Sequence, residues 1–239
     1  MNGPIVHSSD PVTLLGGGDA SVEDVRAALT IAPTCVAADG GAELARRAGV
    51  ALDGLIGDFD SISSETLAVT PPDRRFHITE QDSTDFDKAL RHIAAPVVVA
   101  VGFTGARIDH QLGVLHVLAR RADRPCVVLG DTEIIFVCPP QLRLETAPGD
   151  VVSLFPMGQV SGTSTGLRWA IDGLAFHPMT RTGTSNEALG AIELTMHGPA
   201  MIVIVPRRYL TDVTQVLARA PSSARWPARA ERYTGPTQS

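Results

Sequence analysis

The sequence predicts an α/β protein in which a parallel α/β half is followed by a smaller antiparallel β half. Up to about residue 138, apolar stretches that suit buried strands alternate with helical patterns. After Cys138-Pro139-Pro140 this alternation stops, and short strand-like stretches separated by glycine and turn residues take over. The chain has 239 residues, of which 44% are hydrophobic, so it has enough apolar material for a substantial core.

The first half is built from short strands that each lead into a helix. The strands expected there are residues 12–15, 34–38, 55–56, 75–78, 96–101, 126–129 and 134–137. The near-continuous Val/Ala run at 96–101 is typical of a strand that is buried on both faces.

The helices of this half are predicted from their capping residues and apolar spacing. Ser21, Thr84 and Asp109 are expected as N-caps, and the helix over 42–48 is expected to stop at Gly49. With Thr84, Asp87 forms a capping-box pattern. The expected buried stripes are Phe86, Leu90 and Ile93 in one helix, and Leu112, Leu115 and Leu118 in the next.

The second half is predicted as strands 142–145, 151–155, 166–169, 192–196 and 201–205, with no helix before about residue 207. The tail from Pro221 is rich in Pro, Arg, Ser and Ala and is expected to be loosely held. The resulting domain prediction is 1–138 for the α/β domain, 139–220 for the β domain and 221–239 for the tail.

Composition excludes several classes of partner. The net charge of −6 argues against nucleic acid and against anionic membrane as the main partner. No apolar run approaches the ~20 residues of a membrane span, and no signal peptide is recognisable at the N-terminus. Cys35, Cys126 and Cys138 are odd in number and lie in or beside apolar runs, which suits a reducing compartment. We therefore expect a cytoplasmic protein.

The stretch around which the chain is organised is Ile56-Gly57-Asp58-Phe59-Asp60. Two carboxylates this close repel unless a cation lies between them, and Mg²⁺ prefers such oxygen ligands. Alternatively, Asp58 and Asp60 are only turn and capping residues. Three other expected strands also end in glycines or charged residues, at Gly16–Gly18, at Asp39-Gly40-Gly41 and in the loop leading to Arg107. Because ligands bind at the carboxyl ends of parallel strands, this shared placement favours a site.

Basic residues complete the expected site. Lys88 is the only lysine in the chain, which suggests a position that needs a compact ammonium, although chance retention is equally compatible. Asp85 and Lys88 are three residues apart and share a helix face. Carboxylates and glycines beside Lys88 and Arg107 suit a magnesium–polyphosphate complex better than a free anion.

These residues together resemble the thiamine pyrophosphokinase family. The matching stretches are Ala38–Ala42, Ile56–Ile62, Thr84–Leu90, Gly105–His110, Thr165–Trp169 and Gly183–Glu187, in the family's order. The resemblance implies a Rossmann-like N-terminal domain, a C-terminal β-sandwich and a homodimer with each active site between subunits. It also implies that ATP and thiamine react, with magnesium, to give AMP and thiamine diphosphate.

The resemblance further implies a role for each matched residue. Asp58, Asp60 and Asp85 would hold magnesium, while Asp39, Lys88, Arg107 and Asp109 would surround the triphosphate. Gly40, Gly41, Trp169, Ser185 and Asn186 would bind substrate. The transfer requires alignment and neutralisation of phosphate charge, and either Asp85 or Asp109 could accept the hydroxyl proton. Trp169 offers a flat face to the thiamine cation but could be a core residue, and Ser185-Asn186 could be a turn. The remaining histidines show no clustering, and we assign no role to His7, His77, His92, His116, His177 or His197.

The chain departs from the family pattern in three places: at Val114, in the loop at Phe103-Thr104 and at Arg168. Two alternatives stay open, the first because of the loop departure. One is a related diphosphokinase that acts on another heterocyclic alcohol, such as a hydroxymethylpterin. The other is a non-catalytic sensor of nucleotide or thiamine diphosphate, although a complete carboxylate set with Lys88 argues against it.

Overall fold

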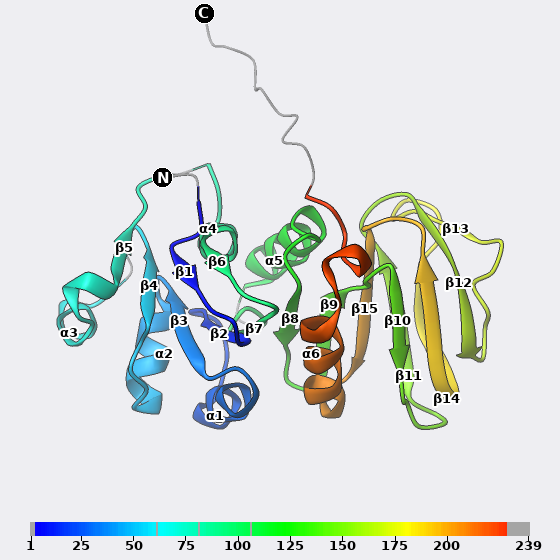
Figure 1. The fold of residues 1–239 in the computed structure, drawn as a ribbon, viewed down its shortest axis with the longest axis horizontal. Helices are drawn as coiled ribbons and strands as arrows, with labels where there is room; N and C mark the ends of the chain where they lie inside the picture. The colour runs from blue at the N-terminus through cyan, green and yellow to red at the C-terminus, as the bar shows by residue number, and fades with distance from the viewer. Residues whose placement is uncertain (1–2, 61, 81, 106, 229–239) are drawn as a thin grey trace, which may run out of the picture.

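The structure is a computed structural model that describes residues 3–60, 62–80, 82–105 and 107–228. It has a mixed α/β fold (Figure 1). Its helices are α1 (Val22–Ile31), α2 (Gly41–Ala48), α3 (Ser64–Val69), α4 (Asp85–His92), α5 (Ile108–Arg120) and α6 (Leu210–Arg219), with 3-10 turns η1 (Pro72–Arg74), η2 (Arg207–Tyr209) and η3 (Ser222–Ala224). None of the described helices has the length and apolar character that crossing a bilayer requires.

The strands of the first half follow the predicted alternation. They are β1 (Val6–His7), β2 (Val12–Leu15), β3 (Thr34–Ala38), β4 (Gly54–Gly57), β5 (Arg75–His77), β6 (Ile93–Ala94), β7 (Val98–Val101), β8 (Cys126–Leu129) and β9 (Glu133–Val137). Strands β3, β4 and β5 pair in parallel, and so do β2, β7 and β8. Strands β2 and β3 lie side by side and bring the two groups together.

The later strands are antiparallel. They are β10 (Gln141–Leu144), β11 (Val151–Pro156), β12 (Val160–Leu167), β13 (Ala175–Phe176), β14 (Gly183–Met196) and β15 (Met201–Pro206). Strand β15 pairs with both β9 and β11, so the hydrogen-bonded sheet runs from the first half of the chain into the second without a break. Strand β14 pairs with β11 through its first residues and with β10 and β12 through its last.

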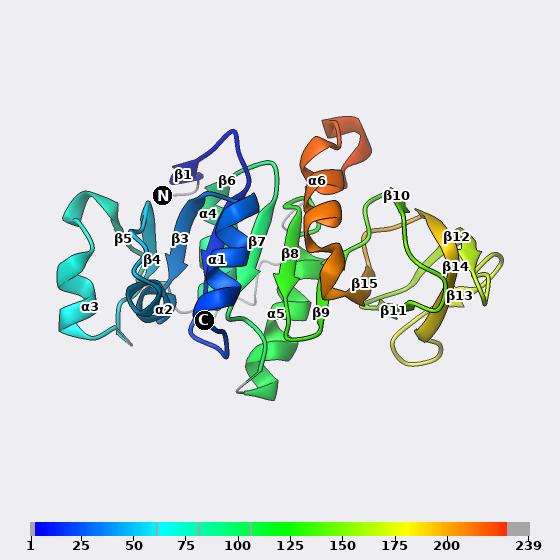
Figure 2. The same ribbon diagram turned by 90° about the horizontal axis from the view of Figure 1, so that it is seen from below.

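Apolar side chains are buried on both faces of the central strands, as the sequence predicts. In β7, Val99 and Val101 belong to one core cluster, while Val98 and Ala100 belong to the other. Helices α1, α2 and α6 contribute to the first cluster, and α4 and α5 contribute to the second. Figure 2 shows α6 and α5 on opposite sides of β8 and β9. The three cysteines are buried and form no disulfide.

Local sequence signals explain several helix ends. The Ser21 side chain accepts the N–H of Asp24, and the Asp24 carboxylate accepts the N–H of Ser21, so α1 begins with a complete capping box. Gly49 ends α2 in the left-handed conformation that glycine adopts without strain. The Thr84 side chain caps α4, also as predicted.

Four local predictions were wrong. Asp87 does not complete a capping box, because its carboxylate is bound by Arg121 and Arg91. Asp109 lies in the first turn of α5, whose N-cap is Arg107. Leu112 is 59% exposed, and Val114 and Val117 take its place in the buried stripe. The strand expected over 166–169 is instead β12, which ends at Leu167 and leaves Trp169 beyond it.

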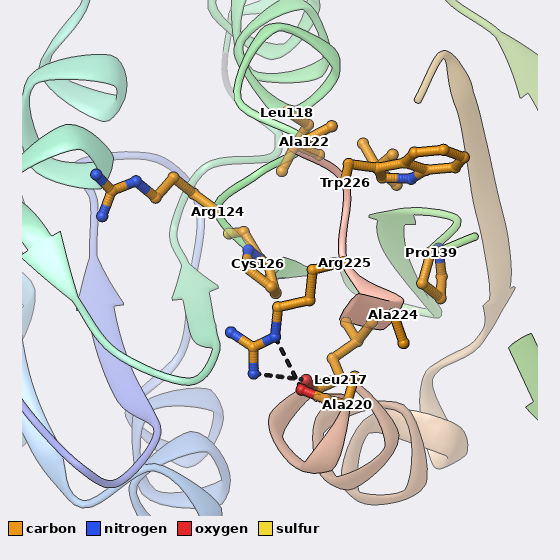
Figure 3. A pocket seen from close by; sticks show the side chains of 12 residues that line it. Leu118, Ala122, Arg124, Cys126, Pro139, Leu217, Ala220, Ala224, Arg225 and Trp226 are labelled. Atoms are coloured by element: carbon orange, nitrogen blue, oxygen red, sulfur yellow. Dashed lines mark hydrogen bonds between the residues drawn. The ribbon is translucent and has the colours of Figure 1, made fainter. Parts of the chain in front are cut away.

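The tail was predicted to be loosely held from Pro221, but up to Trp226 it is bound to the rest of the chain. The indole Nε1 of Trp226 donates to the Cys138 carbonyl at 2.7 Å, and Arg225 donates to carbonyls at the end of α6. Figure 3 shows Arg225 pointing toward Leu217 and Ala220. The cavity beside them has a volume of about 20 Å³, enough for a single water molecule. Residues 229–239 of the predicted tail lie outside the described residues.

Candidate functional site

The ends of four parallel strands meet at one edge of the sheet. After β2, the N–H groups of Gly16 and Gly18 donate to the carbonyls of Val101 and Gly102, at the end of β7, at 2.8 and 2.7 Å. A Cβ on Gly41 would lie 2.1 Å from the carbonyl oxygen of Leu15, so only glycine allows α2 to begin this close to β2. The N–H groups of Gly16 and Gly18 therefore join the ends of β2 and β7.

The carboxylates at this edge form a compact group. Ligand oxygens of Asp39, Asp58 and Asp60 lie within 4.8 Å of one another. Asp39 follows β3 and is 3% exposed, and Asp58 and Asp60 follow β4. One Asp39 oxygen accepts the N–H of Phe59 at 3.0 Å. The prediction assigned magnesium to Asp58, Asp60 and Asp85. In the structure, Asp39 is the third carboxylate that lies close to Asp58 and Asp60.

Three non-glycine residues of the described chain have positive φ, and all three lie in the predicted site motifs. They are Asp39 at 39°, Phe59 at 65° and Ser185 at 60°. Such conformations cost energy, and in proteins they are commonly found at functional sites. At Phe59 the left-handed turn separates the two aspartates of the organising stretch. Ser61 of the same motif lies outside the described residues.

Lys88 is the cation of this cluster. Its side chain is 2% exposed, and its ammonium donates to Asp58 and to Asp85, in both cases at 3.1 Å. Burial alone would lower the pKa of Lys88, but the hydrogen bonds to the two carboxylates outweigh burial and raise it. Lys88 is therefore a fixed positive charge that links α4 to the turn after β4. The predicted shared face of Asp85 and Lys88 is confirmed.

The carboxylates of the cluster have different electrostatic surroundings. The hydrogen bond from Lys88 is the main cause that lowers the pKa of Asp58. Burial, followed by the charges of Asp85, Asp58 and Asp60, raises the pKa of Asp39. An ionised Asp39 is thus unfavourable in the protein alone, and a bound divalent cation would relieve this repulsion. The donor set fits a hard cation that takes oxygen ligands.

Arg107 and Asp109 lie at the start of α5 and are bound to each other. Arg107 donates from Nε to Asp109 at 3.1 Å and from Nη2 at 2.5 Å, and the two side chains are 67% and 61% exposed. The hydrogen bond from Arg107 lowers the pKa of Asp109. An exposed pair of this kind is weak, so Arg107 can exchange the carboxylate for a phosphate. Ala106, before it, lies outside the described residues.

The two C-terminal motifs come together through Asn186. Its Oδ1 accepts the N–H of Trp169 at 3.1 Å, and its Nδ2 donates to the Trp169 carbonyl at 2.7 Å. Asn186 is 5% exposed, whereas Trp169 is 58% exposed with the Arg168 guanidinium 5.9 Å from its ring centroid. Asn186 therefore orients Trp169 by holding its main chain. Ser185 and Asn186 lie in β14, so the alternative of a simple turn was wrong.

Within one chain the two parts of the predicted site are far apart. The acidic cluster follows β3 and β4, whereas Trp169 follows β12 and Asn186 lies in β14. These strands lie toward opposite ends of the long axis (Figure 1). The prediction missed His77, whose Nε2–H donates to the Asp58 carbonyl at 3.0 Å. His77 ends the strand that pairs with β4, and this pairing brings it to the turn.

A model of the family "thiamin pyrophosphokinase, catalytic domain" matches residues 25–129. Thiamine pyrophosphokinase 2 of Arabidopsis thaliana is 32% identical over 138 residues, which cover 49% of this chain and 51% of that protein. Thiamine pyrophosphokinase 1 of Oryza sativa subsp. japonica is 31% identical over 123 residues, which cover 45% and 47%. The chain thus spans about half the length of the curated relatives it matches.

Solved structures share the fold over most of the chain. Thiamin pyrophosphokinase from Geobacillus thermodenitrificans superposes with a TM-score of 0.66 at 23% identity, covering 82% of this chain and 96% of that one. Yeast thiamin pyrophosphokinase gives 0.66 at 16% identity, covering 87% and 94%. At these identities the likeness concerns the fold. The matched region, residues 25–129, contains the acidic cluster and Lys88, so this part of the chain is similar to the catalytic domain of thiamin pyrophosphokinases.

Proposed function

We propose that this protein transfers a diphosphate group from ATP to the hydroxyl of thiamine, giving thiamine diphosphate and AMP. The observation that carries the proposal is the cluster of Asp39, Asp58 and Asp60 with the buried Lys88, inside the region that matches the family. In this interpretation, residues 1–138 form a Rossmann-like catalytic domain and residues 139–220 a β-sandwich that binds thiamine. The proposal includes a cytoplasmic location.

Asp39, Asp58 and Asp60, with Asp85 beside Lys88, are the residues that would hold magnesium. When bound, magnesium neutralises and orients phosphate oxygens. Lys88 supplies a fixed charge next to these carboxylates, and Arg107 can bind a phosphate with two parallel hydrogen bonds once it leaves Asp109. Such groups act mainly by aligning the reactants and stabilising charge.

The chemical step joins the thiamine hydroxyl oxygen to the β-phosphorus and breaks the bond from that phosphorus to the AMP oxygen. AMP leaves with the electron pair, and the hydroxyl proton passes to a carboxylate. Asp109, whose pKa Arg107 lowers while the two are bound, is one of the two predicted acceptors. Asp85, which lies against Lys88 and is 44% exposed, is the other.

We also propose that the active form is a homodimer. Trp169 follows β12 and the acidic cluster follows β3 and β4, and these strands lie toward opposite ends of the molecule, so Trp169 does not reach the cluster of its own chain. A second copy can bring its Trp169 to this cluster. Exposed apolar side chains on both parts suit such an interface: Ile108 and Leu112 on α5, and Val151 and Leu189 on β11 and β14.

Phosphorus NMR of ATP and Mg²⁺, with and without thiamine, tests the reaction. AMP and thiamine diphosphate appearing together would support it and would place attack at the β-phosphorus. AMP release that responds to hydroxymethylpterin and not to thiamine would assign another alcohol. Binding of nucleotide or thiamine diphosphate without turnover would indicate a sensor and contradict the proposal.

Complementation tests the shared site. Asp60→Asn and Trp169→Ala are each expected to be inactive, and we expect mixing the two to restore about a quarter of wild-type turnover, because half of the dimers would carry one intact site. A mixture that stays inactive while co-purification of two differently tagged variants shows mixed dimers would contradict a site built from two chains.

A further inference from the structure

His77 is the last residue of β5 and lies next to the turn that carries Asp58 and Asp60. In the parallel pairing of β4 and β5, His77 is opposite Gly57, the residue before Asp58. The next residue along, Ile78, donates its N–H to the Gly57 carbonyl at 2.8 Å. The main chain of β5 therefore fixes the start of the turn and brings the imidazole alongside it.

The imidazole contacts the turn in two ways. Its Nε2 lies 3.0 Å from the carbonyl oxygen of Asp58, which can only accept, so Nε2–H is the donor. Its ring packs against Phe59, with centroids 5.2 Å apart and planes inclined by 31°. Both contacts act on the peptide that joins the two aspartates.

This peptide needs support because of its conformation. Phe59 has a φ of 65°, which a bulky side chain rarely adopts. The conformation is held from one side by the Asp39 oxygen that accepts the Phe59 N–H, and from the other by His77. If the turn relaxed, the carboxylates of Asp58 and Asp60 would move relative to Asp39.

We propose that His77 is a positioning residue that fixes the Asp58-Phe59-Asp60 turn in the geometry required for divalent-cation binding. The inference rests on the proposed function insofar as it takes the three carboxylates to be a cation site. His77 itself contacts a carbonyl and a ring, so it acts through the turn. Mutation of a residue that contacts the metal-binding residues, and not the metal itself, commonly weakens metal affinity by about 10- to 100-fold.

The experiment titrates the full-length protein with Mn²⁺ and follows free Mn²⁺ by electron paramagnetic resonance. His77→Phe keeps a ring against Phe59 and removes the donor, and we expect it to weaken Mn²⁺ binding about tenfold. His77→Gln supplies an N–H donor and is expected to recover most of this loss. The matched control is His116→Gln, on the exposed side of α5, which should bind Mn²⁺ as the wild type does.

Thermal unfolding without metal separates positioning from simple stability. We expect His77→Phe to unfold at close to the wild-type temperature, because the side chain is exposed and its neighbours in β5 retain their main-chain bonds. Wild-type Mn²⁺ affinity in His77→Phe would overturn the inference and leave the proposed function standing. A wild-type protein that binds no Mn²⁺ would overturn the cation site, and this inference with it.

Discussion

Arg121, which follows α5, donates from Nε to the Asp87 carboxylate of α4 at 2.7 Å, and only 2% of the Asp87 side chain is exposed. Asp87 is two residues from Asp85 and adjacent to Lys88, so this ion pair secures the helix that presents both. We expect Arg121→Leu to lower the free energy of unfolding by about 3–5 kcal/mol, because it leaves a buried charge without its main partner. Urea unfolding would measure the loss.

The matched control for this pair is Arg143→Ala. Arg143 binds the carboxylates of Glu145 and Glu193, but its side chain is 66% exposed, so its removal should cost less than about 1 kcal/mol. Replacing both members, Asp87→Leu with Arg121→Leu, should recover part of the loss. Equal costs for Arg121 and Arg143 would show that burial of Asp87 does not determine the strength of this pair.

Asp60→Asn is expected to lower turnover by about 100-fold or more while the fold remains intact. The variant removes a charge from the three-carboxylate group, and a metal-holding group contributes several kcal/mol to the stabilisation of transferring phosphate. Circular dichroism and AMP formation are the two measurements. Asp212→Asn, which changes an exposed carboxylate on α6, is the control. Near-normal turnover in Asp60→Asn would rule out a metal role for this residue.

Asp39→Asn should make the metal-free protein more stable at neutral pH. Burial and nearby carboxylates raise the pKa of Asp39 above its ordinary 3.8, so the folded chain retains a proton that the unfolded chain has released. Stability therefore falls as the pH rises through this window, and the neutral variant avoids the fall. We expect its Tm in EDTA at pH 7 to rise by about 2 °C or more, the shift that about 1 kcal/mol gives in a chain of this size.

The pH dependence is the check on this reasoning. Below pH 3.8 Asp39 is protonated in both states, and the difference between variant and wild type should disappear. Asparagine tolerates the left-handed backbone and can still accept the Phe59 N–H. Asp10→Asn, at an exposed aspartate, should change Tm little. A lower Tm for Asp39→Asn in EDTA at pH 7 would mean that an ionised Asp39 stabilises the fold.

Asn186→Ala is expected to raise the KM for thiamine about tenfold and to leave the KM for ATP unchanged. The amide holds the main chain of Trp169 through two hydrogen bonds, and its loss lets the indole move away from its bound position. Steady-state kinetics with each substrate varied in turn would measure the split. Equal rises in both KM values would instead indicate general damage to the β half of the molecule.

Much of the fold followed from local patterns. The Val/Ala run of β7, the capping residues Ser21 and Thr84, and Gly49 each have a short-range physical cause, and the structure contains the expected element at each. Strand β14 was predicted only over 192–196, because Ser185 and the glycines at 183 and 190 interrupt the alternation in its earlier part. Its pairing with β11 outweighs these weak local preferences.

The candidate site was predictable where its residues share a strand end or a helix turn. Asp58, Asp60, Asp85 and Lys88 fall in that class, and the structure brings them together. The partnership of Trp169 with Asn186 joins two strands, so no periodicity could indicate it. The same is true of His77, whose hydrogen bond to Asp58 depends on the parallel pairing of β4 with β5.

The uninterrupted sheet limits how this protein can be cut. Strand β9 has β8 on one side and β15, which is contributed more than 60 positions later in the sequence, on the other. A fragment ending at residue 138 would retain Ile134, Ile135 and Phe136 but lose the strand that covers their outer edge. Bare apolar edges pair with one another, so such a fragment should form fibrils or precipitate. Gene fusion or exchange at this position would therefore have to supply a replacement strand along with the new partner domain.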